Sequence, residues 1–77
     1  MNHREYHIIS IEKGQTTLAN SKRIRLNVLA KKTHTDEIVE LKNISLPTYA
    51  IVGDLIKWCE HNYYDVIDGN GGFVYRR

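Results

Sequence analysis

Cys59 and His61 lie two positions apart, and a thiol and an imidazole can bind zinc together or cooperate in nucleophilic catalysis. A structural zinc site needs four such ligands, usually from two separated segments. On a helix, side chains two positions apart point about 200° away from each other. His3 and His7 are the other candidate ligands, and both lie near the N-terminus. We therefore predict neither a metal site nor a nucleophilic Cys and His pair.

The glycine-rich segment "DGNGG" (68–72) invites comparison with ion-binding and phosphate-binding loops. A calcium loop of the EF-hand type needs further oxygen ligands and a glutamate at its twelfth position, which this sequence does not supply. A phosphate-binding loop needs a helix N-terminus directly after the glycines. The segment is therefore predicted to be a tight turn. Walker sequences, nucleophile elbows and paired carboxylates are also missing, so we expect no enzymatic activity and no cofactor.

The clearest pattern in the chain is "RIRLNVLAK" (23–31), in which polar and apolar residues alternate. A period of two is typical of a half-buried strand, here with a basic outer face. Basic side chains can contact phosphates or carboxylates, and tyrosines elsewhere can add contact area. The predicted partner-binding residues are Lys22, Arg23, Arg25, Lys31, Lys32, Tyr64, Tyr75, Arg76 and Arg77.

The other elements follow from composition and period. Further strands are predicted at 5–11, 37–44, 63–67 and 73–77, with 63–67 as either a strand or an extended connection. In residues 48–61 the polar side chains recur at spacings of three and four, which predicts a helix that begins after Pro47. The predicted fold class is α+β: a small antiparallel sheet of four to five strands with one helix packed on one face, in the order β-β-β-α-β-β or β-β-β-α-β.

Residues 33–36 are predicted to form the loop of a hairpin. This loop predicts four cross-strand pairs: Ala30 with Val39 and Val28 with Leu41 on the core side, and Leu29 with Glu40 and Asn27 with Lys42 outside. A slip of one residue would turn the apolar side chains of the second strand toward water, so the register should be well defined.

Composition limits the class of protein. A length of 77 residues allows one small domain, predicted to span residues 1–77. The single cysteine excludes an intramolecular disulfide, on which small extracellular domains usually depend, so we expect a cytoplasmic protein. The first residues are polar and lack the apolar segment of a signal peptide, so we expect none, and no apolar run reaches membrane-spanning length. The net charge is +2, but residues 13–32 hold six basic and no acidic side chains, whereas residues 37–75 hold six acidic and two basic ones.

These features favour a small non-enzymatic protein that acts by binding a macromolecular partner. The first hypothesis is a protein with an acidic surface, bound by the basic strand or by Leu29, Ile38 and Ile44 on an open sheet face. Such a protein would be an inhibitor or adaptor of phage or mobile-element type, for example against a host nuclease or a nucleic-acid-handling complex. The alternative is a nucleic-acid-binding module that uses Arg23–Lys32. Complementary basic and acidic sides also favour a homodimer.

Overall fold

The computed structural model of the protein describes residues 4–12 and 23–75. It contains the strands β1 (Glu5–Glu12), β2 (Arg23–Lys32), β3 (Ile38–Pro47), β4 (Leu55–Glu60) and β5 (Tyr63–Ile67). Within the described ranges there is no helix, and so none long and apolar enough to cross a membrane. The prediction of an α+β fold with one helix is therefore wrong, because the described chain is all-β.

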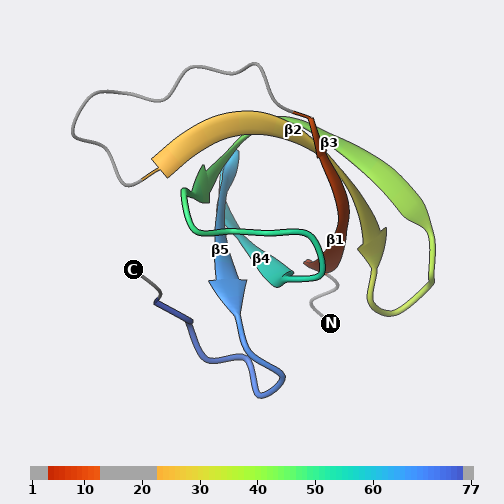
Figure 1. Cartoon of the computed structure of the whole chain (residues 1–77). Coiled ribbons are helices and arrows are strands. Elements are labelled where there is room, and N and C mark those ends of the chain that lie inside the picture. Colours follow the sequence, from red (N-terminus) through yellow and green to blue (C-terminus); the bar gives the residue numbers. More distant parts are fainter. Residues whose placement is uncertain (1–3, 13–22, 76–77) are drawn as a thin grey trace.

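The strands close into a barrel in the order β1-β2-β3-β5-β4 (Figure 1). Neighbouring strands are antiparallel except β3 and β5, which run parallel and share one registered pair, Ser45 with Tyr63. In this order β5 lies between β3 and β4, so the parallel pairing of β3 with β5 and the antiparallel pairing of β4 with β1 close the barrel. Closure pairs most strand edges and leaves open only those segments that extend beyond their neighbours.

Aliphatic side chains that alternate along the strands fill the barrel. Leu26, Val28 and Ala30 of β2 point inward, as their alternation predicted, and are at most 6% exposed. The other strands contribute the remaining buried residues of this core: Ile8, Ile44, Leu46, Ile56, Tyr64 and Val66. Because all five strands share the core, displacing one strand exposes apolar surface on its neighbours.

The register of β2 and β3 agrees with the prediction over most of its length. The predicted pairs of Val28, Leu29 and Ala30 are confirmed. The pair of Asn27 with Lys42 does not form, because the ladder is irregular between Leu26 and Val28. The adjoining Asn43 has a φ of 55°, and its N–H donates to Asn27 Oδ1 at 2.8 Å.

This bulge changes the alternation along β3. Ile38 and Glu40 point outward, and continued alternation would place Ile44 outside as well. The extra residue shifts the phase by one, so Ile44 is only 3% exposed. The predicted exposure of Ile44 on an open sheet face is therefore wrong.

The largest correction concerns residues 48–61, which were predicted to be a helix. Residues 48–54 form two turns instead, and β4 follows them. Gly53 has a φ of 97°, which a right-handed helix does not allow. Its N–H donates to the Ile8 carbonyl (2.9 Å), and the Ile8 N–H donates to the Asp54 carbonyl (2.9 Å). The second turn is therefore hydrogen-bonded to β1.

The sequence of β4 fits a strand as well as it fits a helix. Ile56 is buried and Trp58 packs against the core, while Lys57 between them belongs to the opposite face. A stretch of only six residues, with Lys57 and Glu60 among apolar side chains, is too short to distinguish the two periods. β1 on one side and β5 on the other provide main-chain hydrogen-bond partners that a helix would not use. Pairing with these two strands therefore favours the strand conformation.

The segment 68–72 is a tight turn, as predicted. Asp68 Oδ1 accepts hydrogen bonds from the N–H groups of Gly72 (2.9 Å) and Asn70 (2.8 Å). These bonds favour the carboxylate and lower the pKa of Asp68. Beyond the turn, Phe73 forms only an isolated bridge to β5, so the predicted strand at 73–77 is wrong in its described part.

Asp68→Asn should make folding less sensitive to acid. The folded-state pKa of Asp68 lies below the value of about 3.9 for an unfolded aspartate. Its carboxylate therefore contributes stability above that value, and the contribution is lost as the pH falls through the folded-state pKa. Between neutral pH and about pH 3, the unfolding free energy from urea titration should fall less in Asp68→Asn than in the wild type. Glu60→Gln is the control, because Glu60 is exposed and lies outside the turn. Identical acid responses of Asp68→Asn and wild type would refute this role.

Candidate functional site

The outer face of β1, β2 and β3 carries the side chains that point away from the core. Two rows cross these strands in register: His7, Lys31 and Ile38 in one, and Ser10, Leu29 and Glu40 in the next. Directly opposed residues in antiparallel strands have Cβ atoms about 5 Å apart. The two rows therefore form one continuous surface.

Three aliphatic side chains make this surface apolar at its centre. Ile9 is 41% exposed, Leu29 42% and Ile38 61%, so the predicted exposure of Leu29 and Ile38 is confirmed. Ile9 lies at the bulge of β1, between Ile8 and Ser10. These three residues with His7, Lys31 and Glu40 are termed the outer patch. An apolar centre with a charged and polar rim is the composition of many protein-binding surfaces.

Three of the predicted basic contacts lie on or beside this surface. Arg25 and Lys31 are exposed on β2, and Lys32 is half-buried at its end. Lys31 Nζ lies 3.7 Å from Asp36 Oδ1, and Lys32 Nζ lies 3.4 Å from Glu37 Oε1. Such solvent-exposed ion pairs contribute little and are easily exchanged for other partners. The β2–β3 turn thus brings acidic side chains beside the basic strand, which reduces the charge separation predicted from sequence.

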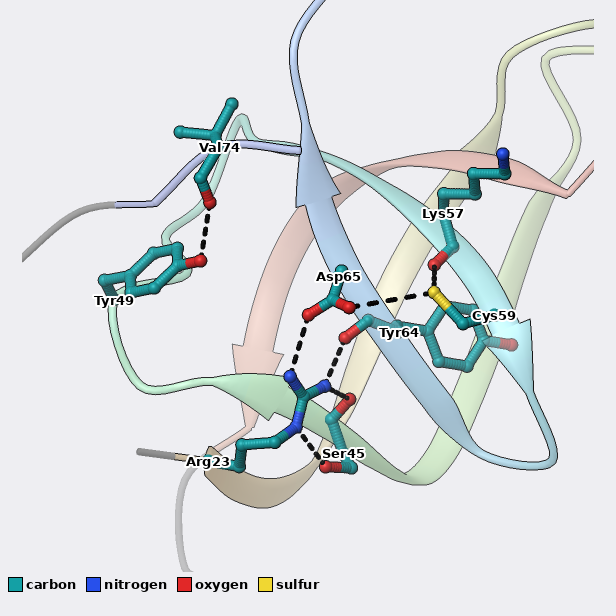
Figure 2. A network of polar contacts seen from close by, with 8 residues as sticks. All are labelled: Arg23, Ser45, Tyr49, Lys57, Cys59, Tyr64, Asp65 and Val74. Atoms are coloured by element: carbon teal, nitrogen blue, oxygen red, sulfur yellow. Dashed lines mark hydrogen bonds and ion pairs between the residues drawn. The ribbon is translucent and has the colours of Figure 1, made fainter. Parts of the chain in front are cut away.

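Arg23 differs from the other basic residues of β2, because its guanidinium bonds to β3 and β5 (Figure 2). Nε donates to Ser45 Oγ (2.9 Å), and one terminal nitrogen donates to Asp65 Oδ1 (2.7 Å). The other terminal nitrogen donates to the carbonyls of Ser45 (2.9 Å) and Tyr64. The guanidinium carbon also lies 3.6 Å from the centroid of the Tyr63 ring. These contacts are termed the Arg23 clamp.

The Arg23 clamp bridges β3 and β5, the neighbouring strands with the fewest registered pairs. β3 and β5 share one registered main-chain pair, so few main-chain bonds hold them together. Arg23 reaches from β2 and donates to the main chain of both strands. The side chains of Arg23 and Asp65 are only 22% and 26% exposed. The Arg23 side chain is therefore engaged inside the fold, whereas Arg25 and Lys31 face solvent.

Of the two tyrosines predicted to contact a partner, one is buried and the other is exposed. Tyr64 is 7% exposed and packs edge-on against Tyr6, with ring centroids 6.0 Å apart. Burial, with a smaller contribution from Tyr6, raises the pKa of Tyr64 to about 12. Tyr64 is thus a core residue without a surface for a partner, whereas Tyr75 is 83% exposed. The remaining predicted contacts, Lys22, Arg76 and Arg77, lie outside the described residues.

Cys59 is exposed on β4, beside the Arg23 clamp. Its Sγ lies 3.7 Å from the Lys57 carbonyl oxygen and 3.8 Å from Asp65 Oδ2 (Figure 2). Partial burial and the Asp65 carboxylate raise the pKa of the thiol, which lowers its thiolate fraction near neutral pH. Among the described residues, no group of three or more His, Cys, Asp and Glu side chains could hold a metal ion.

Three important residues were not predicted from the sequence. Ile9 is exposed because of the bulge in β1, which has no clear sequence signal. Ser45 and Asp65 lie 22 and 42 positions from Arg23, so no local pattern connects them. A partial signal for Asp65 was present, since it alternates with two apolar neighbours and should point outward from β5.

No model of a known protein family matches the chain, and neither a curated protein nor a solved structure does. The function is therefore argued from the surface itself.

Proposed function

We propose that this protein is a non-enzymatic binding module that docks onto another protein through the outer patch. One observation carries the proposal: Ile9, Leu29 and Ile38 are 41–61% exposed on three neighbouring strands of a closed barrel. Exposed apolar surface is unfavourable by about 25 cal/mol per Å². A partner that covers these side chains therefore gains free energy from the hydrophobic effect.

The barrel presents the outer patch in a preformed shape. Leu29 and Lys31 alternate along β2 with Val28 and Ala30, which are 1% and 0% exposed. The strand cannot shift without disturbing the core that these buried residues fill. A preorganised surface loses little conformational entropy on binding, which favours affinity.

Charges around the outer patch indicate the chemistry of the partner. Lys31 lies between His7 and Ile38 in its row, and Arg25 is exposed further along the same face of β2. An arginine can bind a carboxylate with two parallel hydrogen bonds. The partner should therefore place apolar side chains opposite Leu29 and carboxylates opposite Lys31 and Arg25.

Nucleic-acid binding by β2 is the second candidate. Barrels with this connectivity bind oligonucleotides on the β2–β3 face, an argument from fold analogy, and Arg25 and Lys31 are exposed there. Single-strand binders also stack bases on aromatic side chains. β2 and β3 contain no Phe, Tyr or Trp, and Tyr6 of β1 packs against the core. This lack of a stacking surface on the patch favours the protein partner.

Two pairs of substitutions test the proposal. Leu29→Ser with Ile38→Ser should reduce capture of the partner from a nuclease-treated lysate by at least about tenfold, because it removes the apolar centre of the patch. Ile51→Ser with Val52→Ser is the matched control, since Ile51 and Val52 are each 56% exposed but lie in the β3–β4 connection. Mass spectrometry of the bound fraction measures the yield of each captured protein.

The partner is the protein that the first variant loses and the control variant retains. Circular dichroism and urea titration verify that both variants are folded. Equal losses in the two variants would show that the outer patch is not the binding site. The second candidate would be supported instead if the protein captured nucleic acid. This nucleic acid should then be lost after nuclease treatment, at added salt and in the variant Arg25→Glu.

The same proposal includes a cytoplasmic location and an inhibitor or adaptor role of phage or mobile-element type. The support for the location is the single cysteine, because small extracellular domains usually depend on disulfides. The support for the role is the small size together with the missing catalytic motifs. A partner from a nuclease or a nucleic-acid-handling complex in the capture experiment would agree with this role.

A further inference from the structure

Among the described residues, the first half of β3 has an open edge. From Ile38 to Leu41 the main chain pairs with β2 on one side, and no described residue pairs with positions 38–42 on the other. β5 reaches β3 only at Ser45, and the Asn62 side chain donates to the Asn43 carbonyl (2.9 Å). In Figure 1 this half of β3 is the light-green strand of the β2–β3 hairpin. The segment 38–42 is termed the β3 edge.

Alternate residues of the β3 edge direct their main-chain groups to the open side. The Lys32 N–H donates to the Glu37 carbonyl (2.9 Å) where the hairpin turns. From this bonded pair, the alternation of an antiparallel ladder directs the N–H and C=O groups of positions 39 and 41 to β2. Positions 38, 40 and 42 direct theirs outward. A further strand can therefore bond to Glu40 and Lys42.

Charge determines which strand fits this edge. Glu40 and Lys42 project from the same face of β3, with Oε1 and Nζ 3.8 Å apart and side chains 50% and 72% exposed. When two identical strands pair antiparallel about Leu41, Glu40 of each copy lies opposite Lys42 of the other. Pairing about Glu40 would instead bring two carboxylates together. Opposite charges thus select one register.

We propose that the β3 edge pairs with the β3 edge of a second copy, antiparallel and centred on Leu41. The hydrogen-bonded positions are Glu40 and Lys42, whose main-chain groups face the open side. The Leu41 pair is not hydrogen-bonded, and in such pairs the Cα atoms approach to about 4.5 Å. Leu41 is half-buried within one chain, so pairing buries more of it. The interface is two-fold symmetric and uses the strand edge; it shares Glu40 with the outer patch but none of the three aliphatic side chains of that patch.

Exchange of the two charges tests the pairing by sedimentation equilibrium. Glu40→Lys places two basic side chains on the edge, and Lys42→Glu places two acidic ones there. Each variant alone should self-associate at least about tenfold more weakly than the wild type, because two attractive pairs become repulsive. An equimolar mixture of the two variants should associate again, since opposite charges then face each other. The double variant Glu40→Lys with Lys42→Glu should self-associate like the wild type.

The mixture separates a loss of pairing from a failure to fold, because a misfolded chain would not be rescued by its counterpart. Added salt should weaken the wild-type dimer, since both charge pairs are exposed. A wild-type protein that stays monomeric up to its solubility limit overturns the proposal. A dimer that is insensitive to both charge reversals also overturns it, as does a mixture that associates no better than its components.

Discussion

Arg23→Ala is expected to lower the free energy of unfolding by about 2 kcal/mol. The substitution removes the donor from the carbonyls of Ser45 and Tyr64 and leaves the Asp65 carboxylate, 26% exposed, without its cation. Breaking a fully buried pair in this way costs about 3–5 kcal/mol. Water reaches this pair in part and screens it, so we expect a smaller loss. Urea titration followed by circular dichroism measures it.

Arg25→Ala is the matched control, because Arg25 lies two residues further along the same face of β2 and is exposed. Its substitution should change the free energy of unfolding by less than about 0.5 kcal/mol. Arg23→Lys should restore only part of the stability, since an ammonium group does not reproduce the planar fork of a guanidinium. Equal losses in Arg23→Ala and Arg25→Ala would mean that the clamp does not hold β3 and β5 together.

The Arg23 clamp also changes how the basic strand must be tested. The sequence pattern does not distinguish Arg23 from Arg25, because both lie on the same face of an amphipathic strand. In the barrel, Arg23 bonds to β3 and β5 while Arg25 faces solvent. Loss of binding after Arg23→Glu would therefore mix a surface effect with destabilisation. Arg25→Glu and Lys31→Glu address the surface without disturbing the clamp.

Local alternation was sufficient to predict the strands that carry the outer patch. The period of two along β2 assigned Leu26, Val28 and Ala30 to the core and Leu29 to the surface, as observed. The four-residue loop then predicted the register of the hairpin, because a slip would have exposed apolar side chains. These predictions succeeded since both depend on residues close together in the chain.

The helix prediction failed where the local pattern was ambiguous. Polar residues at spacings of three and four in 48–61 also agree with two turns followed by a short strand. Gly53 at positive φ separates the two parts, and a glycine in sequence does not reveal its φ. Non-local pairing of β4 with β1 and β5 then decides the conformation.

Barrel closure was beyond local reasoning for a related reason. It depends on one parallel pairing between β3 and β5 and on the contact of Arg23 with Asp65, residues 42 positions apart. The bulge at Asn43 could not be predicted from the local pattern either, and it changed the site because it places Ile44 inside the barrel. The outer patch is therefore smaller than the sequence alone implied on β3, and Ile9 extends it on β1.

Leu46→Ala is expected to have the largest effect on stability, a loss of about 3 kcal/mol in the free energy of unfolding. Leu46 is fully buried in β3, in the half of the strand that meets both β2 and β5. Truncation removes apolar contacts and leaves a cavity that the closed barrel cannot collapse to fill. In a domain of this size the melting temperature should fall by roughly 15 °C.

Leu29→Ala provides the same chemical change at a position that is 42% exposed on the outer patch. Its cost in stability should be below about 1 kcal/mol, because little packing is lost there. If Leu29→Ala destabilised the protein as much as Leu46→Ala, the outer patch would be part of the packing and not a surface kept for a partner. A stable Leu29→Ala protein with weakened partner capture, beside a destabilised Leu46→Ala protein, would separate the residues that fold the barrel from those that bind.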